Sequence, residues 1–112
     1  MAQRLITIVE TAVFARQAKE IWTEAELDEF VLHIAGNPEI GTVIPDTGGV
    51  RKLRWKRAGT GKRGGVRVIY YYHDEDRPVY LLMVYAKAVQ DDLDPDEKKL
   101  VRDLAATLKR KR

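Results

Sequence analysis

The sequence predicts a small α+β domain: a twisted antiparallel sheet with an N-terminal helical hairpin packed on one face and a C-terminal helix. Three observations favour this class. A β-branched run opens the chain, and two amphipathic helical patterns follow it. Three strand-like runs then lie close together, and a last helical pattern follows them. A chain of 112 residues supports one core rather than two, so we expect a single domain over residues 1–112.

The first strand and the two helices are predicted from local patterns. The run RLITIVET, residues 4–11, is rich in apolar and β-branched side chains. Thr11 is a suitable N-cap for the first helix. The apolar face of that helix carries Phe14, Ala18, Ile21 and Trp22. Thr23 and Glu26 have capping-box spacing before the second helix, and Gly36 is a natural residue just beyond its end.

The second half of the chain predicts three strands and a helix. The connector EIGTVIPDTGG precedes strand-like runs at Val50–Arg57, Val66–His73 and Val79–Ala86. The joints GTGKRGG and DEDRP are short, so both connections are expected to be hairpins between antiparallel strands. Pro95 suits the first turn of the final helix. The apolar positions of that helix are Leu100, Val101, Leu104 and Leu108.

Positive charge is concentrated in one segment. Residues 47–73 hold eight Lys or Arg and no acidic residue, although the whole chain has a net charge of only +3. Alternation along RKLRWKR places Leu53 and Trp55 on the face toward the helices. The opposite face then carries Lys52, Arg54 and Lys56. Arg67 enters an otherwise apolar strand, which is costly unless its guanidinium is paired or lies at an open site. These cations favour a nucleic-acid ligand, with a solvated strand face as the alternative.

Composition excludes several other classes of site. The chain has no Cys, so it has neither a disulfide framework nor a thiolate metal site. No apolar run approaches the roughly 20 residues of a membrane span, and no secretory leader pattern opens the chain. The acidic stretch DDLDPDE lacks the glycine and ligand spacing of a calcium loop. We therefore expect a cytoplasmic protein that contacts no membrane and uses no metal or other cofactor.

Four stretches together resemble the RelE/ParE toxin superfamily, and within it the RelE- and HigB-type toxins of type II toxin–antitoxin modules. They are GGVRKLRW, GTGKRGGVRVIYYY, YLLMVYAK and DLDPDEKKLVRDL. The resemblance covers almost the whole chain, and the family fold agrees with the patterns above. It implies an endoribonuclease that inhibits translation by entering the ribosomal A site and cutting mRNA there. The implied partners are the ribosome, mRNA and a HigA-like helix-turn-helix antitoxin.

The resemblance also implies a metal-independent reaction, in which the ribose 2′-hydroxyl attacks the adjacent phosphodiester. Arg67 matches the strand arginine that contacts the scissile phosphate. Lys52 and Arg54 match a basic strand pair that supplies charge and can supply the base. Lys87 matches the basic residue after the last strand, which acts as acid or phosphate ligand. The candidate residues for binding RNA or the ribosome are Arg51, Lys56, Arg57, Lys62 and Arg63.

One departure from the family pattern follows Lys87. RelE carries a tyrosine shortly after its last basic residue, whereas AVQDDLD contains none. Two other functions stay open from the sequence: a ParE-like inhibitor of DNA gyrase, and an RNA-binding domain without catalytic activity. ParE-like relatives generally lack the basic set that this chain keeps, which favours the nuclease.

Overall fold

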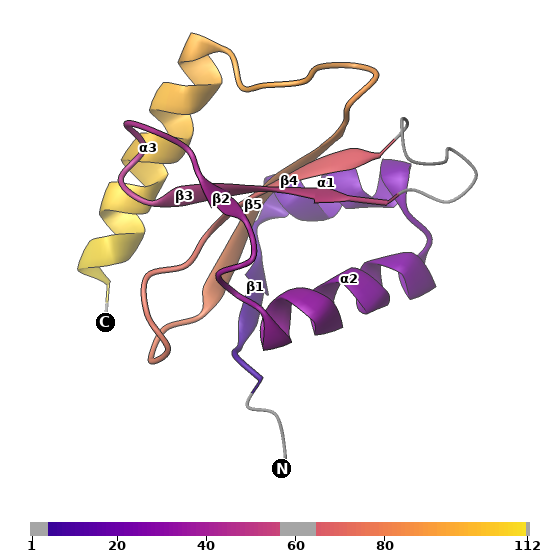
Figure 1. The fold of residues 1–112 in the computed structure, drawn as a ribbon, viewed down its shortest axis with the longest axis horizontal. Helices are drawn as coiled ribbons and strands as arrows, with labels where there is room; N and C mark the ends of the chain where they lie inside the picture. Colours follow the sequence, from indigo (N-terminus) through magenta and orange to yellow (C-terminus); the bar gives the residue numbers. More distant parts are fainter. Residues whose placement is uncertain (1–4, 57–64, 112) are drawn as a thin grey trace.

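The computed structural model describes residues 5–56 and 65–111 and confirms the α+β class (Figure 1). In chain order the elements are β1 (Ile8–Glu10), α1 (Ala12–Ile21), α2 (Glu24–Gly36), β2 (Thr42–Val43), β3 (Val50–Trp55), β4 (Val66–Tyr71), β5 (Val79–Ala86) and α3 (Pro95–Arg110). Within the described residues, no helix is both long enough and apolar enough to cross a membrane.

The strands form one five-stranded sheet in the order β1-β5-β4-β3-β2. The predicted antiparallel arrangement of β3, β4 and β5 is confirmed. The sheet as a whole is mixed, because β1 runs parallel to β5, with Ile8 opposite Val79. At the other edge, β2 pairs with β3 inside the segment that the sequence predicts as a connector. Both edge strands are short. The partner of β1 lies far away in the sequence, whereas β2 is joined to β3 by residues 44–49 only.

Helix starts follow the predicted caps. The Thr11 hydroxyl accepts a hydrogen bond from the backbone N–H of Phe14 at the start of α1. Thr23 and Glu26 form the predicted reciprocal capping box of α2. The end of α2 differs by one residue from the prediction, because Gly36 is its last helical residue and the next residue is the C-cap.

Pro95 does occupy the first turn of α3, and Asp94 is the N-cap of this helix. The Asp94 carboxylate accepts from the Glu97 backbone N–H, and the Glu97 carboxylate accepts from that of Asp94. This second capping box fixes the point where the segment between β5 and α3 ends.

The sheet separates two apolar clusters. One cluster includes residues of α1 and α2 and the sheet residues that face them, namely Leu53, Val66, Val68, Tyr70, Val79, Leu81 and Val84. The other joins Val101 and Ala105 of α3 to the opposite face, through Val50, Ile69, Tyr71, Leu82 and Tyr85. The helical hairpin and α3 therefore cover opposite faces (Figure 1).

A β-bulge adjusts the register of β5 against β4. Ile69 lies opposite Met83, but the next residue, Tyr70, lies opposite Leu81. Leu82 is therefore an extra residue on β5. Both Leu82 and Met83 belong to the cluster on the α3 face. Beyond the bulge, Met83 and Tyr85 of β5 therefore lie opposite Ile69 and Arg67 of β4 and share their face.

Candidate active site on the α3 face of the sheet

Three polar side chains form a row across the strands β3, β4 and β5. Arg54 lies opposite Arg67, and Arg67 lies opposite Tyr85. Directly opposed residues on one face have Cβ atoms about 5 Å apart. The two strand neighbours of Arg67, Val66 and Val68, belong to the helical-hairpin cluster. The row, called the Arg67 row below, therefore lies on the opposite face, which α3 partly covers.

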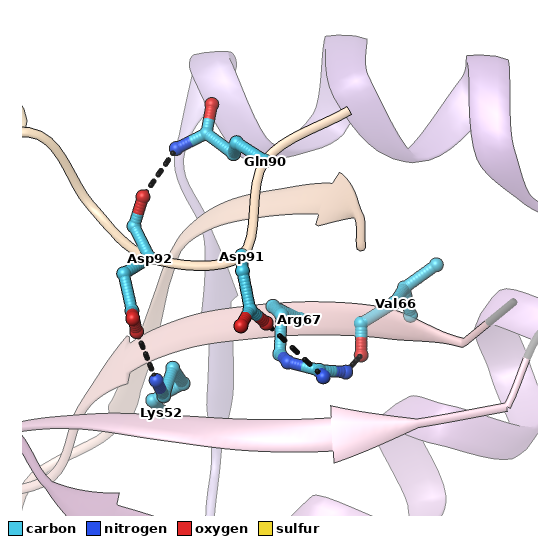
Figure 2. Close-up of polar contacts among 6 residues, drawn as sticks. All are labelled: Lys52, Val66, Arg67, Gln90, Asp91 and Asp92. Carbon is cyan, nitrogen blue, oxygen red and sulfur yellow. Dashed lines mark hydrogen bonds and ion pairs between the residues drawn. The ribbon is translucent and has the colours of Figure 1, made fainter. Parts of the chain in front are cut away.

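Arg67 is buried but incompletely hydrogen-bonded. Its side chain is only 4% exposed. The guanidinium donates from Nη1 to the Val66 carbonyl oxygen and from Nη2 to the Asp91 carboxylate, both at 3.4 Å (Figure 2). Both distances exceed the usual range for N–H···O bonds. Nε has no hydrogen-bond partner among the described residues. A buried guanidinium in this condition is costly and favours an oxyanion that could accept from two nitrogens at once.

Lys52 lies two residues before Arg54 on β3, opposite Ile69 and on the same face. Its ammonium forms a hydrogen-bonded ion pair with the Asp92 carboxylate (Figure 2). This contact with Lys52 lowers the pKa of Asp92 from its usual value. A hollow of about 150 Å³ lies beside the pair, and Lys98 of α3 adds a further cation to its lining.

Asp91 and Asp92, called the acidic pair below, come from the segment between β5 and α3. Gln90 holds this segment through its side-chain amide, which donates to the Asp92 carbonyl oxygen at 3.1 Å and to the Glu97 carboxylate at 2.9 Å. The two aspartate side chains are nevertheless 65% and 71% exposed. The carboxylate side of each pair is therefore open to solvent, and an anionic ligand could compete with the aspartates for Arg67 and Lys52.

Tyr85 ends the Arg67 row under the same segment. The residue is buried, and its hydroxyl makes no hydrogen bond within the described part of the chain. Burial is the main cause that raises the pKa of Tyr85 to about 12, and the carboxylates of Asp92 and Glu97 add to it. The phenol therefore stays protonated at neutral pH and can donate a hydrogen bond.

Arg54 and Lys87 are the exposed members of the predicted catalytic set. Arg54 is placed in the Arg67 row, as alternation along β3 predicts. Lys87 follows β5 in a turn, where its backbone N–H donates to the Gly65 carbonyl oxygen at 3.1 Å. It lies two residues beyond Tyr85, at the end of the sheet nearest Arg67. The structure thus places Lys52, Arg54 and Arg67 on the α3 face, with Lys87 in the turn beyond the neighbouring end of β5.

The predicted RNA-binding residues are not gathered in the same way. Arg51 faces the other side of β3, where its Nη1 donates to the carbonyl oxygens of Glu39 and Gly41 at 3.0 and 2.8 Å. The predicted face is wrong for Lys56: β3 ends at Trp55, so strand alternation no longer applies, and the Lys56 ammonium pairs with Glu29 of α2 at 2.8 Å. The remaining three lie outside the described residues: Arg57, Lys62 and Arg63.

Two features of the site were not predicted. Asp94 of the acidic stretch caps α3, but no pattern in the sequence predicts that the acidic pair meets Arg67 and Lys52. The stretch YLLMVYAK contains Tyr85, but the sequence pattern predicts no functional role for its hydroxyl. Its polar position follows from the register of β4 against β5, and the bulge at Leu82 hides that register from simple alternation.

Comparisons with known proteins agree with this architecture. A family model described as the RelE toxin of the RelE/RelB toxin–antitoxin system matches residues 6–112. This match takes in every helix and strand of the structure. Among solved structures, a double arginine-to-alanine variant of the E. coli toxin RelE in the free state has a TM-score of 0.57 to this chain. The two are 12% identical, and the likeness covers 78% of this chain and 88% of that chain. At this identity the structural likeness supports the fold alone.

Proposed function

The chain belongs to the RelE toxin family, so it is a toxin of a toxin–antitoxin system, and we propose that it is a ribosome-dependent endoribonuclease. In this proposal it enters the ribosomal A site in the cytoplasm and cuts the mRNA codon there. Translation then stops because the message is broken. The mRNA phosphate backbone is the ligand of the α3 face, and Arg67 contacts the scissile phosphate.

Arg67 is the observation that carries the proposal. A strand arginine that is 4% exposed and held by two contacts of 3.4 Å is costly for the fold alone. A phosphate would satisfy the guanidinium by accepting from two of its nitrogens. Lys52 and Arg54 add positive charge on the same face. In the proposed complex, phosphate oxygens take the places of the Asp91 and Asp92 carboxylates.

The proposed reaction breaks one bond to phosphorus and forms another. The 2′-oxygen attacks the adjacent phosphorus and its proton passes to a base. Of the basic pair, Lys52 is the candidate, acting as the neutral amine, while Arg54 keeps its proton and supplies positive charge. The bond from phosphorus to the 5′-oxygen breaks, and that oxygen takes a proton from an acid, for which Lys87 is the candidate. Arg67 stabilises the extra negative charge on the pentacoordinate phosphate. The products are a 2′,3′-cyclic phosphate and a 5′-hydroxyl.

The partner and subtype belong to the same proposal. The matching family is described by its toxin–antitoxin system, so this toxin has an antitoxin. We propose a HigA-like helix-turn-helix protein, as expected for the HigB type that the motifs resemble. A short neighbouring reading frame that encodes such a protein would support this choice.

Cleavage of mRNA on purified 70S ribosomes tests the nuclease directly. We expect the wild-type protein to cut ribosome-bound message and leave free message intact. Arg67→Ala should lose at least about 100-fold in cleavage rate, because one charge-stabilising donor typically contributes this much. Circular dichroism and thermal unfolding would check that the variant folds. Arg16→Ala removes an exposed arginine from α1 and serves as the matched control with unchanged cleavage.

Three outcomes would contradict parts of the proposal. A folded Arg67→Ala protein with undiminished cleavage would overturn the role of Arg67. Binding to programmed ribosomes without any cleavage would favour the RNA-binding domain. Intact mRNA together with a DNA-damage response on induction would favour a gyrase inhibitor.

A further inference from the structure

The Arg67 row contains two buried donors that lack partners. Nε of Arg67 and the hydroxyl of Tyr85 are both buried, and neither makes a hydrogen bond within residues 5–56 and 65–111. The two residues lie directly opposite each other on β4 and β5. Buried polar groups are nearly always hydrogen-bonded, and each exception calls for a physical explanation. Two such exceptions side by side point to one shared acceptor.

We propose that Tyr85 is a further catalytic residue, whose hydroxyl donates a hydrogen bond to a non-bridging oxygen of the scissile phosphate beside Arg67. This inference rests on the proposed nuclease function and adds a neutral donor to its cationic residues. It also gives the site a tyrosine on β5, before Lys87 rather than after it. Arg67 and Tyr85 together would hold the oxygens that gain negative charge during the attack.

The electrostatics of Tyr85 define its part in the reaction. Because its pKa is raised to about 12, the hydroxyl keeps its proton at neutral pH and acts as a donor rather than as a base. The proton count of the reaction is unchanged, since the 2′-hydroxyl still loses its proton to the base. The 5′-oxygen still receives one from the acid. Tyr85 transfers no proton; its hydrogen bond stabilises the negative charge on the phosphate oxygens.

Access to Tyr85 requires movement of the acidic pair. The residue is 7% exposed, and the carboxylates of Asp91 and Asp92 lie near enough to help raise its pKa. Both carboxylates are more than half exposed and are held mainly by Arg67 and Lys52. The mRNA phosphates would compete for these same two cations. Binding of RNA would therefore break the two ion pairs of this segment and free the acidic pair to move, while the Gln90 hydrogen bonds still anchor the segment.

Tyr85→Phe tests the proposal because it removes one oxygen and keeps the ring. We expect single-turnover cleavage on saturating programmed ribosomes to fall about 100-fold, with little change in the affinity for those ribosomes. The midpoint of thermal unfolding should stay equal or rise, because the lost hydroxyl has no partner within the described chain.

Tyr71→Phe is the matched control. Tyr71 lies on β4, the strand of Arg67, and belongs to the same apolar cluster as Tyr85, but its hydroxyl contacts His73 Nδ1 at 3.3 Å. It is four residues from Arg67, about 13 Å along β4. We expect wild-type cleavage from this variant.

Three outcomes of this cleavage test would contradict the role of Tyr85. Equal cleavage by Tyr85→Phe and wild type would overturn the role of Tyr85 and leave the nuclease standing. Parallel loss of cleavage and thermal stability would overturn it too, because the hydroxyl would then be structural. Absence of cleavage by the wild type would overturn the proposed function and this inference together.

Discussion

Arg54 and Arg67 lie directly opposite each other on the antiparallel strands β3 and β4. Like charges in this position repel and destabilise a sheet. The acidic pair offsets the repulsion only in part, since Asp91 reaches Arg67 at 3.4 Å and is itself mostly exposed. An anion bound over both guanidiniums would turn the repulsion into attraction. The fold is thus less stable alone than it would be with a phosphate on this face.

Replacing Arg54 should separate stability from binding. We expect Arg54→Thr to raise the free energy of unfolding by up to about 1 kcal/mol, because it removes the like-charge pair. The same change should weaken binding to RNA and reduce the salt dependence of binding by about one unit of slope. Urea unfolding and binding titrations at several salt concentrations measure the two effects. Arg54→Lys keeps the charge and should leave the stability near that of the wild type, and a stabilised lysine variant would contradict the explanation.

Removing the charge of Asp92 should increase the affinity for RNA. Asp92→Asn frees the Lys52 ammonium, so we expect tighter binding to ribosome-bound mRNA at fixed salt. Asp103→Asn is the control, since it makes the same charge change at another exposed ion pair, with Lys99 on α3. Equal gains in affinity from both variants would show that only net charge matters.

The Asp92 pair should also give a pH-dependent contribution to stability. Contact with Lys52 lowers the pKa of Asp92 in the folded state, so its contribution is present above the unfolded pKa of about 4. It is lost as the pH falls through the lower folded pKa. Urea unfolding of wild type and Asp92→Asn should therefore differ near neutral pH and converge in acid. A difference that persists in strong acid would argue against the ion pair as its source.

Tyr70 contrasts with Tyr85, because its buried hydroxyl both donates and accepts a hydrogen bond. It donates to the Pro38 carbonyl oxygen at 2.9 Å and accepts from the Gly41 backbone N–H at 2.8 Å. We expect Tyr70→Phe to lower the free energy of unfolding by about 1–3 kcal/mol, because it leaves buried backbone groups unpaired. Cleavage at temperatures where the variant is folded should be retained, since this hydroxyl lies on the helical-hairpin face. Tyr80→Phe, at a half-buried position, should change stability by less than about 0.5 kcal/mol.

Alkaline unfolding should report the buried state of Tyr85. Its pKa is raised from 10.0 to about 12, so the folded state favours the neutral phenol. Stability from this group is full below the unfolded pKa and is lost as the pH rises through the folded pKa. Between those values the wild type should therefore lose more stability than Tyr85→Phe. Unfolding curves of both proteins across this range, with tyrosinate absorbance, measure the difference, and parallel pH profiles would contradict it.

Much of the fold could be predicted because its signals are local. The capping box at Thr23 and Glu26, the N-cap at Thr11 and Pro95 at the start of α3 all depend on a few neighbouring residues. The parallel pairing of β1 and the two-residue strand β2 could not be found in this way. The partner of β1 is a distant strand, and β2 has only two residues, too few to show alternation, so neither short run of sequence carries a sign of its pairing.

The candidate site was predicted in part for the same reason. Alternation correctly placed Lys52 and Arg54 away from the helical hairpin, and the same rule would have assigned Arg51 to the other face. Tyr85 required the register across the bulge, which no pattern within β5 reveals. The contacts of the acidic pair depend on where the segment after β5 returns over the sheet, and only the folded chain determines that path.

The pairing of β1 with β5 also determines when the protein can first be complete. Ile8 finds its partner only when Val79 has been made, and the Arg67 row requires Tyr85 a few residues later. No shorter nascent chain can hold the whole sheet, and such distant pairing delays folding. A ribosome that makes this protein must therefore translate β5, the last strand of the sheet, before the Arg67 row can form. Until that strand is present, Arg67 has no neighbour on β5 and the candidate site is incomplete.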